Sequence, residues 1–328
     1  MQHLSRYSRQ ELVVGKVSQK RLSTANVAII GLGALGSMSA ELLARAGIGN
    51  LSIIDRDVVE ESNLQRQVLY TEADVGKPKA EAAFRRLKAI NSTLRTTPII
   101  TDINHKNIEK ILENVDIILD CTDNLYTRFL INDFAKKHKK TWVYAGCIQQ
   151  QGSVILLTPN TACFRCFTKE AVGLDTCDTA GILNTASAMT ASLQVQLAMQ
   201  YLTGNRKRNR NNAATATLHH MNLQTMSLSA LQIKKNNHCE ACSGNYEYLN
   251  GKKEPKTLQY QCSNLYQFFV EGIDLETIEK KAGKLGKVRK GKGFLMFGNI
   301  SMFSNGRILI KASSPEKANS LLARYAGI

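Results

Sequence analysis

The chain has 328 residues, of which 43% are hydrophobic, and its formal net charge is +16. Two domains are expected for this length, and the apolar content supplies a sizeable core. No run of about 18 apolar residues occurs, which excludes a membrane-spanning helix. Residues 1–10 are polar and lack the apolar stretch of a secretory signal, so we expect a cytoplasmic protein.

The first 150 residues alternate between strand and helix patterns, which favours a parallel sheet covered by helices. Apolar runs predict strands over Val27–Ile30, Leu51–Ile54, Thr97–Ile100, Val115–Asp120 and Thr141–Ala145. Amphipathic patterns predict helices over Met38–Ala46, Lys79–Ile90, Lys106–Leu112 and Asn124–His138. This half is therefore expected to be a Rossmann-like α/β fold.

Between the first strand and the first helix lies a glycine-rich loop, Gly31-Leu-Gly33-Ala-Leu-Gly36. Gly31 permits the tight turn, Gly33 allows the backbone to approach a phosphate, and Gly36 allows the helix to pack on the strand. The helix N-terminus attracts anions, and Asp55 ends the second strand where a carboxylate can bind a ribose hydroxyl. The alternative is an ordinary tight turn between a strand and a helix.

The cations near this loop distinguish ATP from NAD as its nucleotide. No Lys-Ser or Lys-Thr follows the glycines, so the charge of a triphosphate must be balanced from elsewhere in the fold. Arg66, in the block Asn-Leu-Gln-Arg-Gln at residues 63–67, and Lys79 are the nearest candidates. An NAD enzyme does not need both cations so soon after its ribose acid, whereas ATP does.

The strand that ends at Asp120 is followed by Cys-Thr-Asp123-Asn124. Ligands bind at the carboxyl ends of parallel strands, and Mg²⁺ commonly takes one or two carboxylates together with phosphate oxygens. Asp123 is therefore a candidate magnesium ligand. The alternative is that Asp123 only caps the helix that follows.

After Gly152 the pattern changes to strands interrupted by one helix. We expect strands over Ser153–Leu157, Ala213–Met221 and Thr225–Ile233, and a helix over Ala186–Leu202. The sheet is therefore expected to be mixed, with antiparallel strands in this half.

The eight cysteines include two C-x-x-C pairs, Cys163 with Cys166 and Cys239 with Cys242. Four thiolates match a tetrahedral structural zinc site. The 72 residues between the pairs exceed the spacing of a local zinc ribbon, so the metal would join distant segments. A dithiol redox pair is the main alternative.

The other cysteines differ in their surroundings. Cys177 is unpaired in a polar segment, as a reactive thiol should be. Cys121, Cys147 and Cys262 are better interpreted as small buried fillers.

Residues 245–328 are expected to form a small basic α+β module. Asn305-Gly306 predicts a hairpin between Ile300–Phe303 and Ile308–Ile310, and Ser314-Pro315 introduces a helix over Glu316–Tyr325. Residues 201–328 hold 20 Lys and Arg against 8 Asp and Glu. The basic runs are at residues 206–210 and 280–292. Such runs are most often solvated, but they can also dock an acidic carrier protein or RNA.

Taken in order, these motifs resemble the ThiF/MoeB adenylyltransferases, relatives of ubiquitin-activating enzymes. The resemblance covers roughly residues 5–244 and is carried by residues 6–10 (Arg-Tyr-Ser-Arg-Gln), the glycine loop, Asp55, residues 62–67, 75–79 and 121–124, both cysteine pairs and residues 176–181. The block at 176–181 looks more like ThiF than MoeB. The resemblance implies an ATP-binding adenylation domain over residues 1–244.

By resemblance, the substrate is a ubiquitin-like sulfur-carrier protein of ThiS or MoaD type that ends in Gly-Gly, and its terminal glycine is adenylated. The expected cofactors are ATP, Mg²⁺ and Zn²⁺. A sulfur-donor protein of desulfurase or rhodanese type is a further expected partner. The pathway, whether thiamine, molybdenum cofactor, tRNA thiolation or protein tagging, is left open because the motifs serve all four.

The resemblance also assigns roles to residues. Arg66 and Lys79 stabilise the phosphates, Asp123 holds Mg²⁺, and Arg9 is supplied across a homodimer interface. Cys177 matches a cysteine that can bond covalently to the activated carrier in some members. The expected nucleotide-binding residues are Gly31, Gly33, Ala34, Gly36, Asp55, Asp57, Ser62, Asn63, Leu64, Gln65, Arg66, Gln67, Lys79, Asp123 and Asn124.

One departure from the family pattern follows Gly181. Residues 182–185 read Ile-Leu-Asn-Thr where many relatives carry Gly-Pro. The geometry of this crossover segment is therefore not predicted.

Two other functions are kept as alternatives. An NAD-dependent oxidoreductase explains the glycine loop and Asp55 only. An RNA-binding or scaffold protein explains the basic tail only.

Overall fold

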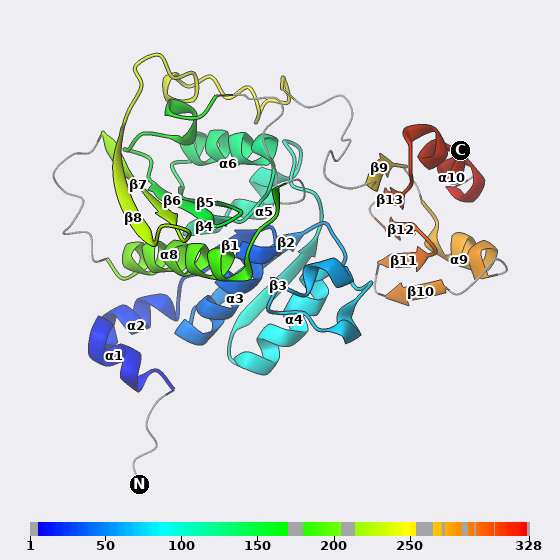
Figure 1. Cartoon of the computed structure of the whole chain (residues 1–328), viewed down its shortest axis with the longest axis horizontal. Coiled ribbons are helices and arrows are strands. Elements are labelled where there is room, and N and C mark those ends of the chain that lie inside the picture. Colours follow the sequence, from blue (N-terminus) through cyan, green and yellow to red (C-terminus); the bar gives the residue numbers. More distant parts are fainter. Residues whose placement is uncertain are drawn as a thin grey trace, which may run out of the picture. The chain divides into compact units, whose positions relative to one another are not determined.

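The computed structural model describes residues 6–169, 180–204, 214–253, 265–270, 273–283, 288–291, 293–304 and 306–326. The chain divides into two compact units, Met1–Glu254 and Pro255–Ile328, and each has its own hydrophobic core. Figure 1 shows the elements of both units. The sequence predicts the domain boundary at 244/245, whereas the first unit ends at Glu254.

The first unit is built on an eight-stranded mixed sheet in the order β3-β2-β1-β4-β5-β6-β7-β8. Its strands are β1 (Asn26–Ile30), β2 (Asn50–Asp55), β3 (Arg95–Ile100), β4 (Ile117–Asp120), β5 (Thr141–Ile148), β6 (Gln151–Leu157), β7 (Thr215–Asn222) and β8 (Ser227–Lys234). The strands from β1 to β5 pair in parallel, and β5 to β8 pair antiparallel. The expected mixed, Rossmann-like sheet is confirmed.

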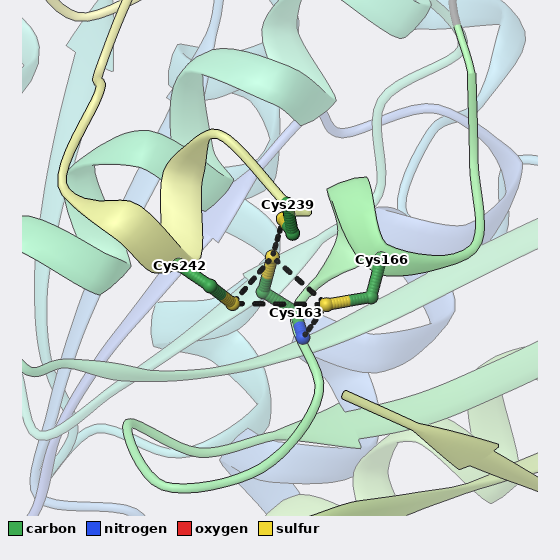
Figure 2. A group of neighbouring side chains, drawn as sticks. All are labelled: Cys163, Cys166, Cys239 and Cys242. Atoms are coloured by element: carbon green, nitrogen blue, oxygen red, sulfur yellow. Dashed lines mark hydrogen bonds between the residues drawn. The ribbon is translucent and has the colours of Figure 1, made fainter. Parts of the chain in front are cut away.

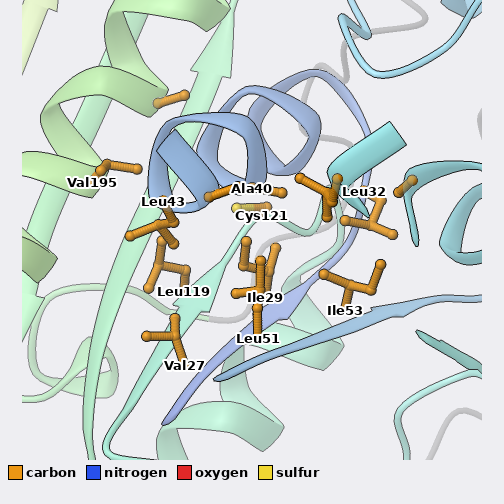
Figure 3. Packing of buried hydrophobic residues seen from close by; sticks show 14 of the residues in the cluster. Val27, Ile29, Leu32, Ala40, Leu43, Leu51, Ile53, Leu119, Cys121 and Val195 are labelled. Atoms are coloured by element: carbon orange, nitrogen blue, oxygen red, sulfur yellow. The ribbon is translucent and has the colours of Figure 1, made fainter. Parts of the chain in front are cut away.

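Helices cover both faces of this sheet (Figure 1). The helices α3 (Ala34–Ala46), α4 (Lys79–Ile90) and α8 (Asn184–Leu202) pack on one face, and α5 (Ile108–Leu112) and α6 (Leu125–Lys137) pack on the other. Successive side chains of a strand point to opposite faces, so Ile29 and Leu119 enter the first core while Ala28 and Ile118 enter the second. Figure 3 shows the first of these cores.

Two short helices that the sequence analysis did not predict precede the sheet: α1 (Ser8–Val14) and α2 (Lys16–Leu22). Gln10 and Gln19 anchor them to the end of α3, because both side-chain amides donate to the Ala46 carbonyl, at 2.8 and 3.0 Å. Between them, α1 and α2 expose three large apolar side chains, Leu12, Val13 and Val17. The helices α1 and α2 are therefore fixed to the end of α3 and expose apolar side chains elsewhere.

Side chains that bond to the backbone set the starts of two helices. The predicted helix at Lys106 begins instead at Ile108, because Asn104 and Asn107 accept backbone N–H groups of the preceding turn. The helix predicted from Asn124 begins at Leu125, and the Asn124 side chain accepts from the Thr127 N–H at 2.9 Å as its N-cap. Short 3₁₀ turns occur at Glu61–Asn63, Glu72–Asp74, Phe164–Cys166 and Ala241–Ser243.

The second unit is a five-stranded antiparallel sheet in the order β10-β11-β12-β13-β9. Its elements are β9 (Leu265–Phe269), α9 (Leu275–Gly283), β10 (Val288–Gly291), β11 (Phe294–Phe297), β12 (Ile300–Phe303), β13 (Arg307–Lys311) and α10 (Pro315–Ala326). Residues Ile278 and Ala318 bring both helices into the core formed with the sheet. The expected small α+β module is confirmed, including the hairpin β12–β13; Asn305, one of its two predicted turn residues, lies outside the described residues.

In the described part of the chain, no helix combines the length and the apolar character needed to cross a membrane.

The close approach of α3 to the glycine loop gives a stability prediction. A Cβ atom at Gly36 would lie 1.8 Å from the Gly31 carbonyl oxygen, a backbone atom that cannot move aside. We expect Gly36→Ala to lower the free energy of unfolding by about 3 kcal/mol or more, measured by denaturant titration.

The matched control is Gly33→Ala in the same loop. A Cβ there would meet only the Gln67 side-chain nitrogen, at 3.9 Å. Its unfolding free energy is expected to fall by no more than about 1 kcal/mol, the usual cost of alanine at an N-cap. Equal stabilities of the two variants would contradict the packing described.

Candidate active site and cysteine cluster

The glycine loop is held between β2 and β4. Gly31 has a left-handed backbone conformation (φ +89°), and its N–H donates to the Ile54 carbonyl at 2.8 Å. Only glycine fits there, because a Cβ would lie 2.7 Å from the Cys121 carbonyl oxygen. Gly33 is the N-cap of α3, so the first N–H groups of this helix, which have no intrahelical acceptor, begin at the loop. The loop can therefore bind an anion such as a phosphate.

Asp55, at the end of β2, fixes the backbone on both sides of its own strand end. One carboxylate oxygen accepts from the Leu32 N–H and the other from the Asp57 N–H, both at 2.6 Å. The side chain is buried; burial raises its pKa, while Lys79 and the two N–H groups act in the opposite direction. Asp55 thus shapes the glycine loop, a role that the sequence analysis did not assign to it.

Tyr70 also holds the glycine loop in place, at the Leu32 carbonyl. Its buried hydroxyl donates to the Leu32 carbonyl at 2.9 Å. Leu32 is therefore bonded at both its N–H and its C=O by side chains from outside the loop. The sequence analysis missed Tyr70, because a lone tyrosine after the block at 63–67 gives no signal of this contact.

Lys79 is a buried cation beside these groups. Its side chain is 9% exposed, and its ammonium lies 3.7 Å from the Asp57 carboxylate. Burial alone would lower the pKa of Lys79, but Asp55, Asp57 and the nearby Asp123 raise it above its ordinary value. Lys79 therefore stays protonated and supplies a fixed positive charge at the carboxyl edge of the sheet.

The block at 60–67 forms a tight turn whose side chains differ in exposure. Arg66 is half-buried, and its guanidinium donates to the Ser62 carbonyl at 2.9 Å. Asn63 accepts from the Glu60 N–H at 3.3 Å, and Gln65 is exposed. Gln67 is buried at 3% exposure, and its side-chain oxygen has no hydrogen-bond partner within the described residues.

At the end of β4, side chains bond to both the N–H and the C=O of Thr122, as they do at Leu32. The Asp120 carboxylate accepts from the Thr122 N–H at 2.9 Å and from its hydroxyl at 2.7 Å. Arg128, on α6, donates to the Thr122 carbonyl at 2.6 Å and lies 3.6 Å from Asp120. Burial raises the pKa of Asp120, and Arg128 opposes this shift.

The fixed turn at Thr122 presents Asp123, whose side chain is exposed. The alternative role for Asp123, as a cap of the next helix, is wrong, because the side chain of Asn124 occupies the N-cap position of α6. An exposed carboxylate near Lys79 has the oxygen donor that Mg²⁺ prefers. The cap of this helix is therefore Asn124, the residue after Asp123.

A buried amide links three elements behind the turn. The Gln194 side chain, on α8, donates to the Asp120 and Val143 carbonyls at 2.8 and 3.0 Å. Its oxygen accepts from Ser39 at 3.0 Å and from the Cys121 thiol at 3.2 Å. Burial raises the pKa of Cys121, so this thiol is a packed, unreactive group, as the sequence indicates.

The four cysteines of the two C-x-x-C pairs come together in one cluster (Figure 2). Cys163 lies 3.5 Å from Cys239, 3.6 Å from Cys242 and 3.7 Å from Cys166, sulfur to sulfur. A tetrahedral zinc with bonds of about 2.3 Å places its sulfurs about 3.8 Å apart. The cluster therefore fits such an ion, and the structure contains no disulfide between these cysteines.

The cluster is fastened to α6 by an arginine between the cysteines of the first pair. Arg165 lies 3.3 Å from the buried Asp133 carboxylate and 2.9 Å from Glu247. Asp133 also accepts from the Tyr248 N–H at 3.1 Å. The segment that follows the second pair thus packs against α6 and belongs to the first unit.

Two predicted site residues are not among the contacts described above. Arg9 is exposed on α1, and Cys177 lies outside the described residues, as does Cys262. At the end of the crossover segment, Gly181 accepts from the Gln149 N–H at 2.8 Å, and Leu183 donates to the Gln149 carbonyl at 3.0 Å. Residues 181–183, where the sequence departs from the family pattern, are therefore tied to the turn between β5 and β6.

Comparison with known proteins agrees with the resemblance found in the sequence. The chain is 46% identical over 205 residues to the sulfur carrier protein ThiS adenylyltransferase of Bacillus subtilis, with 61% of each protein covered. It is 32% identical over 249 residues to the molybdopterin-synthase adenylyltransferase of Escherichia coli, covering 74% of this chain and 97% of that one.

A likeness in structure extends over three-quarters of the chain. The crystal structure of Escherichia coli MccB with MccA-N7isoASN matches with a TM-score of 0.65 at 23% identity, covering 75% of this chain and 76% of that chain. At this identity the match shows a shared fold. The sequence profile of the ThiF family matches residues 7–242, the part that contains the glycine loop, the fixed turns and the cysteine cluster, and the chain therefore belongs to the ThiF family.

Proposed function

We propose that this chain uses ATP to adenylate the C-terminal glycine of a ubiquitin-like sulfur-carrier protein. The names of its relatives support the reaction, since they include adenylyltransferases of sulfur carriers and of molybdopterin synthase. The observation that carries the proposal is Lys79, a buried and protonated side chain beside the glycine loop. An NAD site does not need both Lys79 and Arg66, whereas a triphosphate does.

In the proposed reaction the carboxylate of the carrier's last glycine attacks the α-phosphorus of ATP. A bond forms between the carboxylate oxygen and this phosphorus, and the bond to the oxygen that bridges to the β-phosphorus breaks. Pyrophosphate leaves with the electron pair, and the carrier becomes an acyl-adenylate. Both reactants are anionic, so the chain's cations must screen their approach.

We assign Lys79 and Arg66 to the phosphates, and Asn63 and Gln67 to the orientation of the nucleotide. The buried and unbonded Gln67 oxygen supports its assignment, because such a group requires a partner. Asp55 bonds to the backbone through both oxygens, and each oxygen retains a lone pair for a ribose hydroxyl.

Asp123 is the proposed ligand for Mg²⁺, which when bound neutralises phosphate charge. The four clustered cysteines are the proposed ligands of a structural Zn²⁺. The anchoring of the cluster to α6 by Arg165 supports a structural role for this ion.

We further propose a homodimer in which Arg9 reaches the partner's nucleotide. The exposed apolar side chains of α1 and α2, next to Arg9 in sequence, support burial of this helix pair against a second copy. Sulfur transfer through Cys177 from a donor protein would follow adenylation. A cytoplasmic location agrees with the need for ATP and with the free cysteines of the described residues.

Exchange of labelled pyrophosphate into ATP tests the adenylation step. We expect exchange only when one Gly-Gly-terminated ubiquitin-like carrier of the same genome is added, because adenylation requires its carboxylate. Arg66→Ala should lower the exchange rate by about 100-fold or more, since a phosphate cation is lost. Arg85→Ala, which removes a half-exposed arginine of α4 paired with Glu81, should not.

The carrier that supports exchange would name the pathway. Absence of exchange with every carrier, although the protein binds ATP, would refute the proposed reaction. Reduction of NAD with a small substrate would favour the oxidoreductase instead.

Metal analysis tests the cysteine cluster. We expect one zinc per chain, and the double variant Cys163→Ser/Cys239→Ser should lose the metal and unfold at a lower temperature. Cys147→Ser, outside the cluster, should keep its zinc. Metal-free protein with an unchanged unfolding temperature, or with two reducible disulfides, would favour the redox alternative.

Subunit mixing tests the composite site. Arg9→Ala and Arg66→Ala should each be inactive alone, but an equal mixture that exchanges subunits should recover about a quarter of wild-type exchange, because half the dimers then hold one complete site. The double variant Arg9→Ala/Arg66→Ala mixed with either single variant should stay inactive. If Arg9 acts within its own chain, no mixture will regain activity.

A further inference from the structure

Two successive peptide groups in the glycine loop are each held by a buried side chain. Asp55 accepts the N–H of Leu32, which belongs to the peptide group between Gly31 and Leu32. Tyr70 donates to the C=O of Leu32, which belongs to the peptide group between Leu32 and Gly33. The second contact determines the direction of the Gly33 N–H, which belongs to the same peptide group as the Leu32 C=O.

This N–H is that of Gly33. A peptide group is planar and trans, so its N–H points opposite to its C=O. Because the Tyr70 hydroxyl holds the Leu32 oxygen, the Gly33 N–H is turned away from Tyr70. Gly33 is the N-cap of the 13-residue helix α3, where N–H groups have no acceptor within the helix.

We propose that Tyr70 is a positioning residue that directs the Gly33 N–H at a phosphate of the bound nucleotide. A hydrogen bond to the Leu32 oxygen also polarises the peptide group and makes the Gly33 N–H a stronger donor. The proposal rests on the proposed function only in taking the nucleotide to be ATP. Asp55 and Tyr70 act on the phosphates through the backbone and do not touch them.

An independent observation marks the space in front of Gly33 as a ligand position. A Cβ at Gly33 would have a single neighbour, the side-chain nitrogen of Gln67 at 3.9 Å. The oxygen of the same Gln67 amide is buried and has no hydrogen-bond partner in the described chain. A buried amide beside an open backbone position indicates a polar ligand there.

Tyrosine suits this position because its donor is neutral and does not ionise. Burial, together with Asp55, Asp57 and Asp74, raises the pKa of Tyr70 well above its ordinary value. The hydroxyl therefore remains a donor at every physiological pH.

The test is Tyr70→Phe, which removes only the hydroxyl. In the carrier-dependent exchange assay we expect the KM for ATP to rise about five- to tenfold and kcat to change less than about twofold, because the phosphate contact is present before and during the reaction. Adenosine, which has no phosphate, serves as a competitive inhibitor, and its inhibition constant should be unchanged. Tyr248→Phe, at an equally buried tyrosine beside the cysteine cluster, is the matched control.

A general loss of structure would weaken ATP and adenosine alike, so a parallel rise in both constants would overturn the proposal. So would a KM for ATP within about twofold of the wild-type value. Unfolding temperatures of both variants confirm that the fold is retained. If the wild-type chain shows no exchange with any carrier, the proposed function fails separately. Calorimetric titration of the wild type and of Tyr70→Phe with ATP and adenosine then tests the role of Tyr70. Equal ATP affinities of the two proteins would refute that role.

Discussion

Two buried aspartates, at the ends of the two strands that flank β1, determine the shape of the candidate site. Asp55 ends β2 and accepts backbone N–H groups of the glycine loop and of its own turn. Asp120 ends β4 and accepts from Thr122 in the next turn. A buried carboxylate is unfavourable unless it is hydrogen-bonded, so these bonds form wherever the sheet forms. The fold and the site are therefore specified together.

Each of these aspartates also has a cation near it. Lys79 lies near Asp55 and Asp57, and Arg128 lies near Asp120. The carboxylates of Asp55 and Asp120 are themselves fixed by backbone N–H groups. In the proposed reaction, Lys79 is therefore a buried cation that is in place before ATP binds. Gln194 links α8 to the same region, since its side chain donates to the carbonyls of Asp120, at the end of β4, and of Val143 in β5.

The sequence predicts the parts whose signals are local. Glycine spacing located the loop, alternation of patterns gave the sheet, and the C-x-x-C pairs identified four ligands that the fold brings together. Contacts between distant segments give no such signal: Tyr70 bonds across 38 residues, and Gln194 across 74 to Asp120. The helices α1 and α2 are not predicted, because three of their apolar side chains, Leu12, Val13 and Val17, face outward and break the one-sided pattern of a buried helix. The sequence fits both alternatives for Asp123, a magnesium ligand and a helix cap, and the observed N-cap at Asn124 excludes the second.

The cysteine cluster has a consequence for the order in which the chain folds. The hairpins β5–β6 and β7–β8 join neighbouring segments, whereas the cluster joins residues 163–166 to residues 239–242 across an intervening helix and hairpin. Contacts between distant residues carry the larger loop-closure entropy and form late. A metal ion held by all four thiolates would then bind only after the antiparallel half is in place. The zinc content of a preparation would therefore measure the fraction of molecules in which folding of the first unit is complete.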